Sequence, residues 1–243
     1  MNRVALITGG ARGIGRAVAL DLAAHDWDVA ICYRTSAAEA EDVLGLVKAK
    51  GARGVAIQSD ISDRNAALRL IQSVEHEWGR IDALIHGAGP YHRVSVLEET
   101  AEGWHSMFDN NLHPVFYLNR EVIPGMKERK WGRIIGFSMA NTEQLVGQPN
   151  LTAHYIAKVG VVVLMRSLAR LVAPYGITAN CIAPGYIDSG SAPREELNEA
   201  IKRIPAGYLG SVDDTAALVR FLLSDEARYI NGANIQVSGG WGI

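Results

Sequence analysis

The sequence predicts a doubly wound α/β domain, in which helices cover both faces of one parallel β-sheet. Short apolar runs alternate along the whole chain with longer segments whose apolar residues recur at helical spacing. Alternating strand and helix units of this kind build parallel sheets with right-handed crossovers. The length of 243 residues fits a single domain, 1–243, with a sizeable core.

The alternation divides the chain into seven strand-like runs separated by helical segments. The strands are expected at Val4–Thr8, Asp28–Tyr33, Gly54–Gln58, Ala83–His86, Arg133–Phe137, Ile177–Ile182 and Asn234–Val237. The helices are expected at about 14–25, 37–50, 64–78, 104–129, 155–173 and 213–224. Numbered along the chain, the strands are predicted to lie in the order 3-2-1-4-5-6-7.

One segment breaks the alternation. Residues 186–211 are rich in Gly, Pro, Ser and charge and follow the sixth strand. Ligands of open α/β sheets bind outside the carboxyl ends of the strands. The segment is therefore expected to be a mobile lid over the substrate, and a long surface loop is the alternative.

Composition excludes several classes of function. The net charge of −2 and the lack of a basic run argue against a nucleic-acid partner. No apolar stretch is long enough to span a bilayer, and the early first strand leaves no room for a signal peptide, so we expect a cytoplasmic protein. Cys32 and Cys181 lie in apolar runs and are predicted to be buried free thiols. The seven histidines show no metal-ligand pairing, so no metal site is predicted.

The glycine-rich turn Thr8–Gly15 joins the first strand to the first helix. Small residues let the backbone approach a pyrophosphate, and the free N–H groups of the helix N-terminus point at its charge. The turn therefore predicts a dinucleotide site. The residues assigned to it are Gly9, Arg12, Gly13, Ile14 and Gly15.

The second strand ends in Tyr33, followed by Arg34, Thr35 and Ser36. An acidic residue at this strand end would bind the ribose hydroxyls of NAD(H), and none is present. Arg34 and Arg12 instead suit a 2′-phosphate, because charge-assisted forked contacts are strong. We therefore predict NADP(H) as the cofactor. For either arginine alone, a solvated surface position is the alternative.

The spacing T-G-x-x-x-G-x-G resembles that of the short-chain dehydrogenase/reductase family, and the resemblance extends from Val4 to about Gly240. It implies a Rossmann-like fold. It also implies that Asp60 accepts a hydrogen bond from the adenine and that the backbone of Ile187 holds the nicotinamide carboxamide. The further residues it assigns to the cofactor are Ile61, Gly87, Ala88, Gly89, Lys158, Pro184, Gly185 and Ser189.

The family's catalytic Ser, Tyr and Lys are matched only in part. The spacing of the residues after Lys158 places it at the position of the family's catalytic lysine. Asn111 resembles the family asparagine that bends its helix and holds a relay water. His154 then stands at the tyrosine position, four residues before Lys158, and Tyr155 is only three residues before it. Met139 stands at the serine position, and Ser138 precedes it on the strand, where it is expected to face the other way.

Three interpretations of this departure stay open. In the first, a local irregularity brings Tyr155 into the site, with Ser138 rotated to assist, since spacings of three and four share a helix face. In the second, His154 is the acid–base group, although Lys158 would favour its neutral form. In the third, the chemistry is lost. Asn141 and Thr142, in a stretch longer than usual for the family, are further candidates for the missing hydrogen bond.

The resemblance is strongest to the 3-oxoacyl-carrier-protein reductase branch. It implies an oxidoreductase that passes a hydride between NADP(H) and a small-molecule carbonyl or alcohol substrate. The alternative is a catalytically impaired NADP(H)-binding sensor or scaffold. The run Val159–Met165 is apolar nearly all round, which predicts that both faces of its helix are covered, so we expect a homotetramer or dimer.

Overall fold

The computed structural model describes residues 2–190 and 194–243. Seven parallel strands form one sheet in the order β3-β2-β1-β4-β5-β6-β9. These strands are β1 (Arg3–Thr8), β2 (Trp27–Tyr33), β3 (Gly54–Gln58), β4 (Ala83–His86), β5 (Gly132–Phe137), β6 (Ile177–Pro184) and β9 (Asn234–Val237). The predicted fold class and strand order are confirmed.

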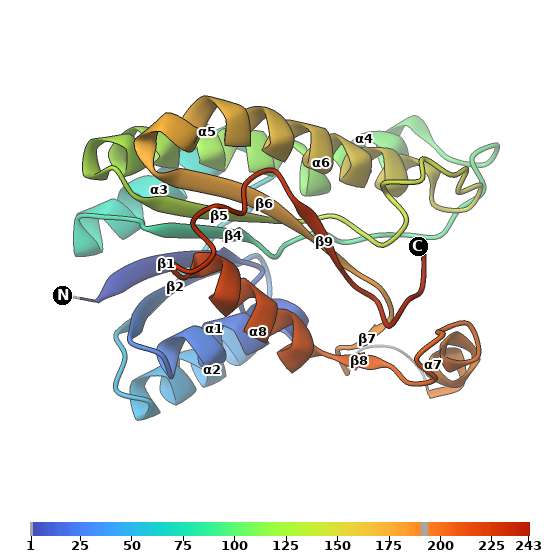
Figure 1. Cartoon of the computed structure of the whole chain (residues 1–243), viewed down its shortest axis with the longest axis horizontal. Coiled ribbons are helices and arrows are strands. Elements are labelled where there is room, and N and C mark those ends of the chain that lie inside the picture. Colours follow the sequence, from blue (N-terminus) through green and yellow to red (C-terminus); the bar gives the residue numbers. More distant parts are fainter. Residues whose placement is uncertain (1, 191–193) are drawn as a thin grey trace.

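The sheet carries helices on both faces (Figure 1). On one face lie α1 (Gly13–Ala23), α2 (Ala37–Ala49) and α8 (Val212–Leu223). On the other lie α3 (Arg64–Trp78), α4 (Ala101–Asn111), α5 (His113–Arg129) and α6 (Thr152–Val172), which continues into the 3₁₀ turn η1 (Ala173–Tyr175). Each face buries its own apolar cluster, which is why the central strands are apolar on both sides.

The predicted helix 104–129 is wrong as a single element, because the chain divides it at Leu112 into α4 and α5. Pro114 stands in the first turn of α5. It has no N–H to continue the α4 hydrogen bonds, and its ring disfavours a helical conformation just before it. Asn111, the last residue of α4, is buried at this junction.

The segment 186–211 is more regular than predicted, although residues 191–193 lie outside the described part of the chain. Strand β7 (Ile187–Asp188) pairs with β8 (Gly210–Ser211), and helix α7 (Arg194–Ile201) lies between them. The unit stands beside the sheet at the end where β6 finishes (Figure 1). Its role as a lid stays a prediction.

Two smaller expectations are also decided by the structure. Cys32 and Cys181 are free and buried, as predicted. None of the helices in the described part of the chain combines the length and the hydropathy that a membrane span requires.

Candidate active site

A cleft of about 1380 Å³ opens at the carboxyl ends of β1, β2, β3 and β4. We call it the nucleotide cleft. Most of the residues predicted to bind the cofactor line it: Gly9, Arg12, Gly13, Ile14, Gly15, Tyr33, Arg34, Thr35, Asp60, Ile61, Gly87, Ala88, Gly89 and Ser189. Lys158, Pro184, Gly185 and Ile187 are not part of its wall.

The glycines of the cleft are required by close backbone packing. A Cβ atom on Gly9 would lie 2.9 Å from the Ala88 backbone, and one on Gly87 would lie 2.6 Å from the Thr8 carbonyl oxygen. Gly13 has a φ of +51° at the start of α1, where a side chain is strained. The turn after β1 and the loop after β4 therefore leave bare backbone and a helix N-terminus facing the cleft, which fits a pyrophosphate.

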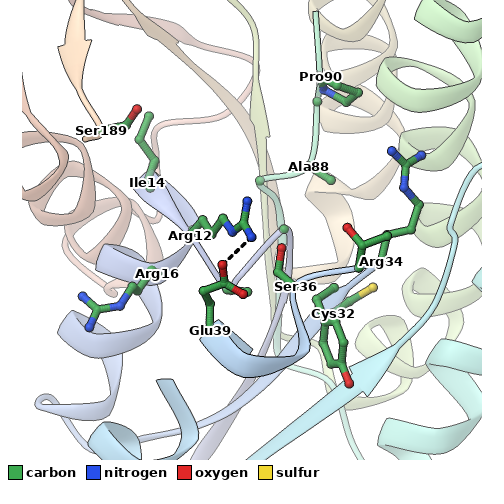
Figure 2. Close-up of a pocket in the computed structure, with 18 of the residues that line it drawn as sticks. Arg12, Ile14, Arg16, Cys32, Arg34, Ser36, Glu39, Ala88, Pro90 and Ser189 are labelled. Carbon is green, nitrogen blue, oxygen red and sulfur yellow. Dashed lines mark hydrogen bonds and ion pairs between the residues drawn. The ribbon is translucent and has the colours of Figure 1, made fainter. Parts of the chain in front are cut away.

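The adenosine end of the cleft holds charges of both signs (Figure 2). Arg12 forms an ion pair with Glu39, a residue in the first turn of α2. Arg34 donates a hydrogen bond of 3.1 Å to the Asn110 side chain, and its guanidinium lies 4.0 Å from the Asp60 carboxylate. The place predicted for the adenosine ribose is therefore lined by guanidinium groups and by carboxylates.

Glu39 and Asn110 are cleft residues that the sequence argument missed. That argument looked for an acid only at the end of β2, whereas Glu39 enters the cleft from the next helix. The signal in the sequence was the position of Glu39, two residues after α2 begins. An acidic side chain in the first turn of this helix can reach the turn after β1, where it pairs with Arg12.

Asp60 serves the loop after β3 as well as the cleft. Its carboxylate accepts hydrogen bonds from the Ser62 hydroxyl at 2.7 Å and the Ser62 amide at 3.1 Å. These bonds hold the pKa of Asp60 below its usual value, with a smaller contribution from the Arg34 charge. Asp63 is the N-cap of α3, so Asp60 does not fill that role.

The Lys158 and Asn111 side chains both end next to Gly89. A Cβ atom on Gly89 would be 2.9 Å from the Lys158 Nζ and 2.8 Å from the Asn111 Oδ1. The Lys158 ammonium donates a 3.0 Å hydrogen bond to the Phe137 carbonyl, and burial lowers its pKa to about 8. The Asn111 amide nitrogen donates to the Pro90 and Met107 carbonyls, and within the described part of the chain its buried Oδ1 has no hydrogen-bond partner.

His154 lies one helical turn before Lys158 and is also buried. Burial, and then the positive charge of Lys158, lower its pKa to about 4, so the ring is neutral near pH 7. The nearby Pro90 backbone, whose carbonyl accepts from Asn111, opposes this fall in the pKa only in part. The buried Nδ1 has no hydrogen-bond partner among the described residues. The ring packs at 5.7 Å from that of Tyr91. We call Asn111, His154 and Lys158 the α6 site.

Tyr155 and Ser138 point away from this group. The Tyr155 hydroxyl donates to the Asn141 carbonyl at 2.8 Å and accepts from the Val146 amide at 3.2 Å. The Ser138 hydroxyl lies 2.7 Å from the Asn234 side-chain oxygen and 3.3 Å from the Ile182 carbonyl. The rotations that the first interpretation requires are therefore absent, because both hydroxyls have partners elsewhere.

Of the two candidates in the stretch before α6, Asn141 has a buried side-chain oxygen without a hydrogen-bond partner among the described residues, so it stays a candidate, whereas the Thr142 hydroxyl is occupied. The Thr142 side chain donates to the Met139 carbonyl at 2.9 Å and accepts from Asn234. The remaining predicted cofactor residues lie at the carboxyl end of β6 and just after it. Gly185 donates its amide to the Val237 carbonyl at 2.9 Å, Pro184 ends β6, and Ile187 begins β7.

The chain is similar to known oxidoreductases over nearly its whole length. The family model described as enoyl-(acyl carrier protein) reductase matches residues 9–242. A 3-oxoacyl-[acyl-carrier-protein] reductase of Staphylococcus aureus is 37% identical over 243 residues, which is 99% of this chain and 98% of the relative. An acetoacetyl-CoA reductase of Shinella zoogloeoides is 38% identical over 246 residues, with 99% and 98% covered.

A solved structure has the same architecture. The crystal structure of a protein from Sinorhizobium meliloti 1021, assigned in its description as a short-chain alcohol dehydrogenase, superposes with a TM-score of 0.92 at 27% identity. The match covers 98% of this chain and 96% of that one.

Proposed function

The chain belongs to the short-chain dehydrogenase/reductase family, and from that premise we propose that it is an NADP(H)-dependent ketoreductase acting on a 3-oxoacyl thioester or a similar ketone. The relatives named as reductases of 3-oxoacyl and acetoacetyl thioesters support this substrate class. They also favour an enzyme over the alternative, a sensor or scaffold.

The observation that carries the proposal is the position of the α6 site at the end of the nucleotide cleft. Gly89 lines the cleft, and Lys158 and Asn111 both reach the position that a Cβ atom on Gly89 would take. When bound, the nicotinamide supplies or accepts the hydride. The chain contributes a buried ammonium and an unpartnered amide oxygen next to the place where that ring would end.

The preference for NADP(H) rests on the two arginines of the cleft. Arg12 and Arg34 both line it beside Thr35 and Ser36. Each guanidinium has a partner that a 2′-phosphate would replace, namely Glu39 for Arg12 and Asn110 for Arg34. Charge-assisted contacts to a phosphate are stronger than a contact to a neutral amide, which supports the exchange at Arg34.

For proton transfer we propose that Lys158 holds the proton and that His154 positions the site. The pKa of Lys158, about 8, keeps it charged at neutral pH, whereas the pKa of His154, about 4, leaves that ring neutral. The His154 ring packs at 5.7 Å from that of Tyr91, beside the Pro90 carbonyl that accepts from Asn111, so the histidine helps to fix the loop that carries Gly89. Neither role requires Tyr155 or Ser138.

The pH dependence of NADPH oxidation tests this assignment. If Lys158 holds the proton, kcat/KM is nearly level below about pH 7.5 and falls as the pH rises through about 8. If protonated His154 is the donor, kcat/KM falls about tenfold for each pH unit above its pKa of about 4. The substrates are an acyl-thioester ketone and a reactive diketone.

Variants complete the experiment. Lys158→Ala should reduce turnover at least 100-fold, and Lys48→Ala, a charge change on the exposed side of α2, should not. His154→Ala and Tyr155→Phe identify any acid that the pH profile misses. NADPH binding without turnover of either ketone by the wild type would contradict the reductase and favour the sensor or scaffold.

We also propose that the chain is a homotetramer or dimer. Helix α6 buries Val161, Val162 and Met165 against the sheet but leaves Val163 58% exposed, and Phe116 of the neighbouring α5 is 48% exposed. An apolar run that is covered on one side only favours a partner on the other. A monomer in sedimentation at micromolar concentration would contradict this proposal.

A further inference from the structure

The ion pair between Arg12 and Glu39 brings an acidic side chain into the part of the cleft assigned to the 2′-phosphate (Figure 2). We propose that Glu39 is a specificity-determining residue: it holds Arg12 before a cofactor binds, competes with the 2′-phosphate for that guanidinium, and so narrows the preference for NADP(H) over NAD(H). This inference rests on the proposed nicotinamide cofactor.

The two side chains come from different elements and meet at the cleft wall. Arg12 is the N-cap residue of α1, and Glu39 stands in the first turn of α2. The Arg12 side chain is 66% exposed and that of Glu39 is 44% exposed, so a ligand in the cleft can reach both. In Figure 2 they point toward each other, while Arg34 extends away from them to its partner Asn110 on α4.

The charges around the adenosine end are balanced. Among the described residues, the wall contains the basic side chains of Arg12, Arg16 and Arg34 and the acidic ones of Glu39, Asp42 and Asp60. Each arginine is paired with one of the acids. Glu39 pairs with Arg12. The Asp42 carboxylate lies 3.0 Å from the Arg16 guanidinium, and that of Asp60 lies 4.0 Å from the Arg34 guanidinium. An incoming 2′-phosphate therefore meets paired guanidinium groups rather than free ones.

Glu39 opposes the phosphate in two ways. The Arg12 guanidinium must leave the carboxylate before it can bind the phosphate with its full fork of donors. The carboxylate, which stays on α2 beside the bound phosphate, then repels it as a like charge. Both effects are specific to the phosphorylated cofactor, and both disappear when Glu39 becomes neutral.

The same carboxylate suits the cofactor that lacks the phosphate. A ribose with two free hydroxyls offers donors, and an acidic side chain is the usual acceptor for them in dinucleotide folds. Glu39 supplies that acceptor from α2, at a place where β2 itself ends without an acid. Removal of its charge should therefore not strengthen NADH binding.

Nucleotide titration of the full chain by calorimetry, without substrate, tests the inference. Glu39→Gln should tighten NADPH about threefold to tenfold at low ionic strength, with NADH unchanged or weaker, and added salt should reduce the gain. Glu41→Gln is the matched control, because it removes the same charge from the same helix at an exposed position outside the cleft wall, and it should change NADPH affinity less than twofold. A thermal unfolding curve for each variant serves as the control that it folds.

A second background isolates the role of Arg12. In an Arg12→Gln chain there is no pair to break, so the gain from Glu39→Gln should shrink. An unchanged gain there, an equal gain from Glu41→Gln, or no gain from Glu39→Gln in the wild-type background would each overturn the inference. The cofactor proposal fails by a different result, namely wild-type binding of NADPH no tighter than NADH together with no effect of Arg34→Ala.

Discussion

The nucleotide cleft and the α6 site lie side by side but are built differently. The cleft depends on backbone: glycines that admit no side chain and a helix N-terminus that faces the pyrophosphate position. The α6 site depends on side chains, and a histidine stands where the family resemblance implies a tyrosine. The cleft therefore follows the pattern of the family resemblance, while the α6 site departs from it.

The largest expected effect is on the backbone of the cleft. Gly13→Val should abolish binding of NADPH and NADH alike, at least 100-fold in affinity, because a side chain at this positive φ is strained and occupies the pyrophosphate space. Gly45→Val is the control, since a Cβ atom there has nothing within 4 Å. Calorimetric titration measures the affinity of both variants for NADPH and NADH. Retained binding by Gly13→Val would mean that the glycine-rich turn does not hold the pyrophosphate.

A smaller effect is expected from a side chain of the same cleft. Arg34→Ala should weaken NADPH binding by roughly 1.5–3 kcal/mol and NADH binding much less, because only NADPH offers a phosphate to the guanidinium. Arg69→Ala, on the exposed side of α3 and outside the cleft wall, serves as the control. Equal losses for the two cofactors would contradict the 2′-phosphate assignment.

The smallest effect is expected at Tyr155, next to the α6 site, and it is a loss of folding stability. Tyr155→Phe leaves the Asn141 carbonyl and the Val146 amide without their shared partner, so the free energy of unfolding should fall by about 1–3 kcal/mol. Turnover should stay within a few-fold. Tyr229→Phe, at a residue that is 99% exposed, should change neither quantity.

Denaturant unfolding and NADPH oxidation are measured together on these tyrosine variants. A loss of turnover above 100-fold in Tyr155→Phe, with unchanged stability, would restore the first interpretation. It would also remove the contrast between the two regions, because the family's phenol would then act from a shifted position.

The elements that the sequence predicted are those with long, regular patterns. The seven strands appear in the expected order, and the glycine turn, Tyr33 and Arg34 line the expected cleft. Strand pairing and crossover handedness follow from general rules, so a periodic pattern suffices for them. The division of helix 104–129 was missed, although Pro114 marks it, because helical periodicity continues across Leu112.

What the pattern along the chain cannot specify is the partner of each polar side chain. Whether Tyr155 faces Lys158 or the Asn141 carbonyl depends on how the loop before α6 packs, and Glu39 meets Arg12 only because α1 and α2 lie together on one face of the sheet. Local propensity and periodicity determine where the helices and strands form. The general rules of strand pairing and crossover then determine the fold and the position of the cleft. Hydrogen bonds and charges between distant segments exist only in the folded chain, and they decide which residues remain available for the cofactor and for proton transfer.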